Sequence, residues 1–299
     1  MAARATRSAS RKARVTEAVA TGPLGALSHD ELGVVFDGLA DPLQPVVAVA
    51  LSSTCLGLRT PLRAALQVLK ERHQKAVVLC RKLDKSCAQV RGAENLYGAG
   101  LLVAADMATL GMILRTNGLP RMEDIFLRSN GLGDTAMQAL CEGLGSGAAP
   151  SLLGLGLSHN NFGPAGAEAL AAALGRGAMP KLVTLFLLGN PIGNRGVAAL
   201  AAPLRKLPAL NQLYLTNCEI GDEGVASLVD NLGKDDFKAL ELLGLSNNKI
   251  TDAGVAKLLA ALDAGGLPKL VSGPQLLKDN PASAIAVEAV HAALVNPVG

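Results

Sequence analysis

The chain has 299 residues and a nearly balanced charge, with 28 Lys and Arg residues against 25 Asp and Glu residues. This balance argues against a nucleic-acid-binding protein and against an acidic disordered chain. Hydrophobic residues make up 49% of the sequence but aromatic residues only 2%, so Leu, Ala and Val must fill the interior. Every long uncharged stretch is interrupted by turn-forming residues, so we expect no membrane-spanning helix and no membrane partner.

The first 26 residues form a basic segment that we expect to be a disordered arm. Five Lys and Arg residues precede the first acidic residue, Glu17. An organelle transit peptide and a nuclear-localisation patch are the alternatives, because both are basic. Residues 1–91 hold 14 basic and 7 acidic residues, whereas residues 92–299 hold 14 and 18, so the N-terminal third carries the excess positive charge.

Residues 27–92 are predicted to form a helical region. The apolar spacing of residues 27–59 indicates three short helices, and Ser28 with Glu31 fits a capping box at the start of the first. Residues 60–91 indicate one or two further amphipathic helices with a basic face. We interpret that face as solvated, since no aromatic residues are interleaved with the charges for base stacking.

The segment from residue 27 to residue 59 resembles an F-box. The resemblance rests on three features: a group of apolar residues at the start of the segment, a turn at Asp41 and Pro42, and a closing group. The closing group consists of Leu51, Ser52, Cys55 and Leu58. Ser28 and Gly33 depart from the family pattern, which has Pro and Leu there. The resemblance implies that the opening apolar residues pack on a Skp-type adaptor of a cullin ubiquitin ligase. These residues are Leu27, Leu32, Val35, Phe36 and Leu39. The alternative is a helical cap of the region that follows.

From residue 122 onward the sequence contains five copies of one repeat. Predicted strand centres follow one another at intervals of 30, 30, 28 and 30 residues: Ile125, Leu155, Leu185, Leu213 and Leu243. The same intervals separate the residues that end each strand: Asn130, Asn160, Asn190, Cys218 and Asn248. The Leu-x-Leu alternation predicts a short strand with its leucines inward. Each Asn can satisfy backbone groups of a buried turn, and Cys218 would replace one member of this Asn ladder.

A helix is predicted after each strand. Asp134, Asn194, Asp222 and Asp252 occupy the positions expected for N-caps, with Pro164 at the matching place in the second unit. The helices are rich in Ala, which allows close approach of neighbours. The terminal units deviate, with a degenerate strand near residues 96–102, a poor strand at 270–280 and a closing helix at 283–294.

The pattern Leu-x-x-Leu-x-Leu-x-x-Asn/Cys in units of 28–30 residues resembles the leucine-rich repeats of the ribonuclease-inhibitor-like class. The resemblance implies an α/β leucine-rich-repeat solenoid over residues 93–299, with degenerate caps at both ends. Parallel strands would line its concave face and helices its convex face. An all-α region would precede it.

The sequence contains no recognisable catalytic or metal-binding constellation. None of the four histidines has zinc-site spacing, and no phosphate-binding glycine loop occurs. His159 lies at a strand exit, where we expect an exposed edge residue. We therefore predict that the chain is not an enzyme and needs no cofactor or metal. Five irregularly spaced cysteines indicate free thiols and an intracellular, cytoplasmic protein, with the nucleus or an organelle as alternatives.

The variable strand positions carry the functional prediction. One outward column reads Phe126, Gly156, Phe186, Tyr214 and Gly244, so it holds three of the seven aromatic residues of the chain. Exposed aromatic residues are typical of protein-binding hot spots, although strands also favour them for cross-strand packing. We predict a protein-binding concave face made by Phe126, Arg128, Phe186, Leu188, Tyr214 and Leu242.

These observations favour a non-catalytic protein–protein interaction module that is monomeric outside its complex. Its finer form would be an F-box-type substrate receptor of a cullin ubiquitin ligase. The alternative is a regulator of another enzyme, of the ribonuclease-inhibitor-like or GTPase-activating type. That function requires a charged or catalytic surface, which the variable columns largely lack.

Overall fold

The computed structural model describes residues 35–36, 39–54, 62–116, 119, 121–145, 148–274 and 276–295. The chain divides into two compact units, the first made of Met1–Arg81 with Lys85–Arg91 and the second of Lys82–Asp84 with Gly92–Gly299. The predicted basic arm, residues 1–26, lies outside the described residues, and so do Leu27 and Leu32.

The first unit is helical where it is described. Its helices are α3 (Val46–Thr54), α5 (Arg63–Lys82) and α6 (Cys87–Gly92), and Val35, Phe36 and Leu39 are also helical. A small core forms because the apolar faces of these segments meet, and it contains Phe36, Ala40, Ala48, Leu62 and Leu69. The predicted turn is present: the Asp41 carboxylate accepts a hydrogen bond from the Leu43 backbone N–H at 2.8 Å and pairs with Arg91.

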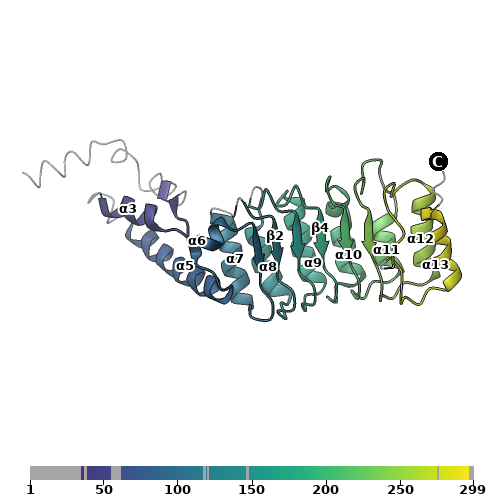
Figure 1. Cartoon of the computed structure of the whole chain (residues 1–299), viewed down its shortest axis with the longest axis horizontal. Helices are drawn as coiled ribbons and strands as arrows, with labels where there is room; N and C mark the ends of the chain where they lie inside the picture. The colour runs from purple at the N-terminus through teal and green to yellow at the C-terminus, as the bar shows by residue number, and fades with distance from the viewer. Residues whose placement is uncertain are drawn as a thin grey trace, which may run out of the picture. The chain divides into compact units, whose positions relative to one another are not determined.

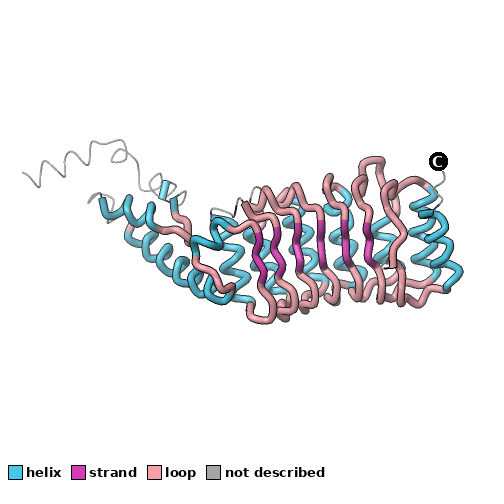
Figure 2. Tube along the Cα trace, viewed as in Figure 1, coloured by secondary structure: helices cyan, strands magenta, loops and turns pink. Residues whose placement is uncertain are grey.

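The second unit alternates strands and helices. Its strands are β1 (Asn95–Tyr97), β2 (Asp124–Phe126), β3 (Gly154–Gly156), β4 (Thr184–Phe186), β5 (Gln212–Tyr214) and β6 (Leu242–Gly244). Its helices are α7 (Ala104–Thr116), α8 (Asp134–Gly143), α9 (Pro164–Gly175), α10 (Gly193–Arg205), α11 (Asp222–Val229), α12 (Asp252–Asp263) and α13 (Ala284–Val295). The strands form one parallel sheet in chain order, and Figures 1 and 2 show the helices as a second layer behind it. The predicted α/β repeat solenoid is confirmed.

The predicted strand register is also confirmed. Leu155 lies opposite Ile125 on one side and Leu185 on the other, and the series continues through Leu213 to Leu243. All five side chains are buried. The first strand differs from the prediction, because β1 ends at residue 97 and residues 98–102 are loop and turn. Leu96 of β1 pairs with Ile125 and extends the buried row by one strand.

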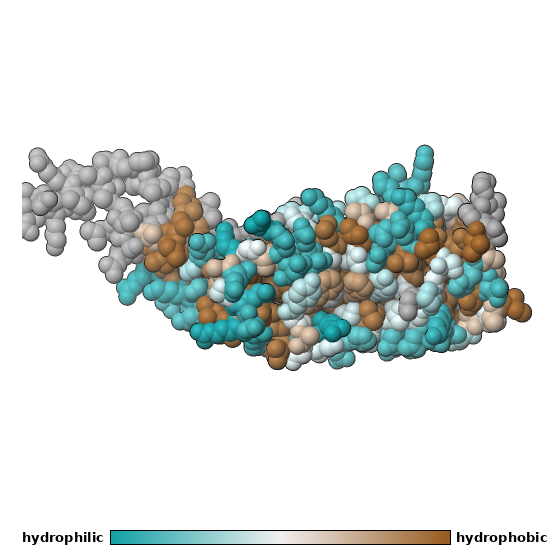
Figure 3. All heavy atoms as spheres, viewed as in Figure 1, coloured by the Kyte–Doolittle hydropathy of each residue, from teal (hydrophilic) through white to brown (hydrophobic). Residues whose placement is uncertain are grey.

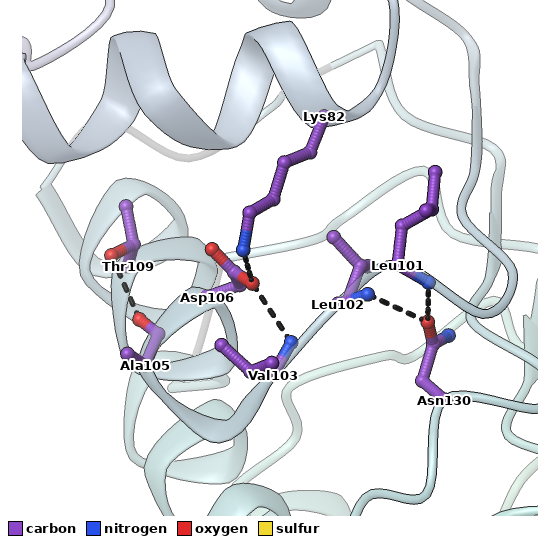
Figure 4. Close-up of polar contacts among 8 residues, drawn as sticks. All are labelled: Lys82, Leu101, Leu102, Val103, Ala105, Asp106, Thr109 and Asn130. Carbon is purple, nitrogen blue, oxygen red and sulfur yellow. Dashed lines mark hydrogen bonds and ion pairs between the residues drawn. The ribbon is translucent and has the colours of Figure 1, made fainter.

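An Asn ladder ties each turn to the preceding unit. The Asn160 amide oxygen accepts from the backbone N–H groups of Asn130 and Leu132 at 3.0 and 3.2 Å. Its nitrogen donates to the Leu127 and Leu157 carbonyls, which directly follow β2 and β3. Figure 4 shows Asn130 making the equivalent bonds to Leu101 and Leu102 at 3.0 and 2.9 Å. Cys218 takes one place in the ladder, and its thiol donates to the Leu187 carbonyl at 3.4 Å.

The predicted N-caps are wrong, because these side chains cap the helix of the following unit. The Asp134 carboxylate accepts from the backbone N–H groups of Gly163 and Gly166, at the start of α9 rather than α8. Asn194, Asp222 and Asp252 reach the next unit in the same way. A carboxylate at a helix N-terminus satisfies free N–H groups and interacts favourably with the helix dipole. The caps therefore join neighbouring units.

The C-terminal end has no strand among the described residues 270–280. This segment instead bonds irregularly to the β6 region, through Val271 N to the Glu241 carbonyl at 3.0 Å and Leu245 N to the Leu276 carbonyl at 3.0 Å. The Asn280 amide oxygen accepts from Ile250 N at 3.1 Å and so continues the Asn ladder. The helix α13 closes the array, as predicted.

Candidate protein-binding surface

Four aromatic rings form a continuous row across the outward face of the sheet. Strand register places Tyr97, Phe126, Phe186 and Tyr214 in one column, on β1, β2, β4 and β5. Tyr97 stacks on Phe126 with ring centroids 5.5 Å apart, and Phe186 stacks on Tyr214 at 4.7 Å. The two stacked pairs meet at 6.0 Å between Phe126 and Phe186. We call this row the aromatic ladder.

Gly156 makes the ladder continuous. It is the β3 member of the column, between Phe126 on β2 and Phe186 on β4. A Cβ atom at Gly156 would overlap the Phe126 ring at Cδ1, so the Phe126 ring occupies the space that a side chain would fill. Since adjacent strands lie about 4.8 Å apart, only the missing side chain allows rings two strands apart to come into contact.

Two further columns flank the ladder. On the side nearer the strand starts, the column contains Asn95, Asp124, Gly154, Thr184, Gln212 and Leu242. Residues that follow the strands make the other: Arg128, Ser158, Leu188, Thr216 and Ser246. Figure 3 shows the result, with hydrophobic and hydrophilic residues intermingled on the sheet side of the repeats. The face therefore combines apolar rings with hydrogen-bonding groups, as protein-binding surfaces do.

The structure brings the six predicted binding residues to this face. Phe126, Phe186, Leu188, Tyr214 and Leu242 are half-buried, and Arg128 is exposed. Sequence reasoning missed Tyr97, which is 60% exposed and begins the ladder. The signal was present, because Leu96 and Tyr97 each lie 29 residues before their partners on β2.

Burial changes the pKa values of two ionisable groups on the repeats. Burial raises the pKa of the Asp124 carboxyl, which lies over Gly154 beside the Phe126 ring. Burial likewise raises the pKa of the Cys218 thiol to about 12, which keeps it protonated and unreactive at neutral pH. His159 is exposed at its strand exit, as predicted. Within the described ranges, no group of His, Cys, Asp and Glu residues is arranged to hold a metal ion.

The F-box-like residues fall in the first unit. Phe36 is 1% exposed in the small core, packed with Ala48, Leu62 and Leu69, while Val35 and Leu39 are half-buried. Leu27 and Leu32 cannot be placed, because they lie outside the described residues. An adaptor could reach the Phe36 ring only if that ring left its core, so adaptor binding remains a prediction from the sequence.

Comparisons with known proteins agree with the repeat assignment. Residues 149–171, 206–229 and 240–259 match the family model described as Leucine Rich repeat. Curated proteins contain no match to the chain. The crystal structure of a Rad7 and Elc1 complex in yeast is similar at 11% identity and a TM-score of 0.36, covering 82% of this chain and 78% of that one. A likeness this low carries no argument about function. None of the described helices has the length and apolar character needed to cross a membrane.

Proposed function

We propose that the chain is a non-catalytic protein-recognition module that binds its partner through the aromatic ladder. Leucine-rich repeats indicate a protein-interaction module, and their regular strands present side chains in fixed columns. The observation that carries the proposal is the ladder itself: four of the seven aromatic residues of the chain lie in one outward column.

The rings lie outside the buried core of the solenoid, which supports contact with a partner. The buried row beneath them, from Leu96 to Leu243, consists of leucine and isoleucine and is complete without the rings. Aromatic side chains supply large contact areas at a small cost in conformational entropy. The ladder therefore resembles a hot spot that is already ordered before the partner arrives.

An affinity pull-down with mass spectrometry tests this function. The full chain should recover a protein that the variant with both Phe126→Ala and Phe186→Ala fails to recover. A matched control is Ile285→Ala with Val295→Ala, which removes two exposed apolar side chains of α13, 84% and 69% exposed, away from the ladder. Recovery of the same proteins by the ladder variant would refute the proposal. An enzyme among the recovered partners would favour the ribonuclease-inhibitor-like or GTPase-activating alternative.

A finer form of this proposal makes the chain an F-box-type substrate receptor of a cullin ubiquitin ligase. It is supported by helical residues Val35, Phe36 and Leu39, the turn at Asp41 and Pro42, and the helix α3, an order that fits the F-box-like sequence. In this form, the first unit would bind the adaptor and the aromatic ladder of the second unit would bind the substrate.

A Skp-type adaptor provides the test of this finer form. The full chain should bind a purified Skp-type adaptor, and Leu27→Ala with Leu32→Ala should abolish binding without changing the melting temperature. If the unaltered chain does not bind the adaptor, residues 27–59 serve only as a helical cap, and the recognition function of the sheet face is unaffected.

A further inference from the structure

Two unpaired charges flank the aromatic ladder around one strand, with Asp124 at the start of β2 and Arg128 in the turn that follows it. Among the flanking columns described above, only Asp124 and Arg128 are charged, and both belong to the β2 segment, on opposite sides of Phe126. In the part of the chain that the structure describes, neither side chain forms a hydrogen bond or an ion pair. The rest of the sheet face offers hydroxyl, amide and apolar groups.

Asp124 is the more informative of the two charges. Its carboxylate is half-buried, lies over the bare backbone of Gly154 and is close to the Phe126 ring, since a Cβ atom at Gly154 would overlap Asp124 Oδ1 and lie 3.4 Å from Phe126 Cζ. A carboxylate that has lost part of its hydration without gaining a partner raises the free energy of the unbound protein. A cation delivered by a binding partner would compensate that loss.

We propose that the partner of the sheet face is an exposed polypeptide segment that presents a basic side chain to Asp124, an apolar side chain to Phe126 and an acidic side chain to Arg128. This inference rests on the proposed function, because it specifies the chemistry of the segment that the ladder binds. Charge complementarity on both sides of an apolar contact selects the orientation of the segment as well as its identity.

The strand geometry sets the spacing of these charges in the partner. Asp124 begins β2 and Arg128 lies two residues beyond its end, so their Cα atoms are separated by at most roughly 13 Å, the length of four extended residues. An extended segment covers that distance in about four residues, and a helix covers it in about eight or nine. The basic and acidic residues of the partner should therefore recur at one of these two spacings, with an apolar residue between them.

A displayed library of random peptides of about 16 residues, long enough for both spacings, is the probe. The full chain and its Asp124→Lys variant are used to select peptides in parallel. The unaltered chain should enrich peptides with an Arg or Lys paired with an Asp or Glu at either spacing. Asp124→Lys should enrich an acidic residue in place of the basic one. Asp263→Lys serves as the matched control, because it makes the same change of net charge at the exposed end of α12.

Three outcomes separate the inference from the proposed function. The same charge pattern selected by the full chain and by Asp124→Lys would overturn the inference. So would the absence of any enriched peptide. If instead Phe126→Ala with Phe186→Ala selects the same peptides as the full chain, the ladder is not the binding surface and the proposed function fails. For one enriched peptide, Asp124→Asn should weaken binding on the order of 10-fold in fluorescence anisotropy, and raised salt should narrow that difference.

Discussion

The Asn side chains that follow the strands act as hydrogen-bonding partners for backbone groups that parallel strands leave free at their ends. Asn160 is 7% exposed, accepts two backbone N–H groups of the preceding unit and donates to the Leu127 and Leu157 carbonyls. Cys218 makes only weak thiol hydrogen bonds at the corresponding place, to the Leu187 and Thr216 carbonyls, and has no amide oxygen to accept a backbone N–H. The side chain at this place thus links each unit to the preceding one, in addition to the helix caps, and the link is weakest at Cys218.

This difference predicts unequal effects of two alanine substitutions. Asn160→Ala leaves buried N–H and C=O groups without partners and should lower the free energy of unfolding by about 2–4 kcal/mol. Cys218→Ala removes two weak thiol hydrogen bonds and a small volume, so it should lower the free energy of unfolding by only about 1 kcal/mol. Chemical denaturation of both variants measures the two values. If both variants lose the same free energy of unfolding, the Asn160 hydrogen bonds contribute no more to stability than the thiol of Cys218.

Buried thiols predict a loss of stability at alkaline pH. Burial raises the pKa values of Cys80, Cys141 and Cys218 to about 12, from an ordinary value of 9.0. The unfolded chain therefore loses these protons from about pH 9 upward, while the folded chain retains them. Their contribution to stability is complete below pH 9 and declines as the pH rises toward 12, by at most about 1.4 kcal/mol per thiol per pH unit.

The variant Cys141→Ala isolates one of these thiols. Denaturation at a series of pH values above 9 should show a shallower decline than in the unaltered chain, although the variant begins less stable. An unchanged slope would mean that the Cys141 thiol ionises equally in both states.

At the scale of the elements, charged groups of one repeat stabilise the helix ends of its neighbour. Asp134 and Asp222 bind the N-termini of α9 and α12, and the Arg176 guanidinium donates to the Cys141 carbonyl at the C-terminus of α8. Negative groups at helix N-termini and positive groups at C-termini interact favourably with the helix dipole. The helices therefore depend on their neighbours for their caps.

Close helix packing predicts that one glycine cannot be replaced. A Cβ atom at Gly143, the last residue of α8, would overlap the backbone of Gly111 in α7. Gly143→Ala must push the two helices apart, so it should cost about 1–3 kcal/mol or more. Gly175→Ala is the matched control at the end of α9, where a Cβ atom meets nothing within 4 Å.

The control should be neutral or stabilising by about 0.5–1 kcal/mol, because Ala reduces the entropy of the unfolded chain. Thermal unfolding of Gly143→Ala and Gly175→Ala measures the stability of both variants. A Gly143→Ala variant as stable as Gly175→Ala would contradict the close contact between α7 and α8.

At the scale of the whole molecule, the repeats stack so that each strand and helix contacts its sequence neighbours. Leu185 lies at the centre of the buried row and is fully buried. Leu185→Ala should cost about 2–5 kcal/mol, and hydrogen exchange should accelerate first in β3, β4 and β5. The control Leu153→Ala removes a leucine that is 37% exposed and should cost less. A Leu185→Ala variant that melts like the unaltered chain would refute the register.

The repeat pattern predicted the strand centres from β2 to β6 because a period of two within each strand and about 30 between strands leaves one inward register. It did not predict the caps across repeats. Asp134 holds the same position in its repeat whether its carboxylate caps its own helix or the helix of the next repeat. Tyr97 escaped prediction because the first unit lacks the full leucine pattern. Contact between Phe126 and Phe186 depends on ring orientation over Gly156, which sequence does not encode locally.

The central claim is tested most directly with the variant that carries both Phe186→Ala and Tyr214→Ala. Calorimetry measures its affinity for the recovered partner, and thermal unfolding measures its melting temperature. Truncation of hot-spot rings costs on the order of 2–4 kcal/mol, so we predict at least a roughly 30-fold loss of affinity. The melting temperature should remain near that of the unaltered chain, because the rings lie outside the buried row. A destabilised variant that binds its partner with unchanged affinity would contradict the account, since the rings would then serve packing and the partner would bind elsewhere.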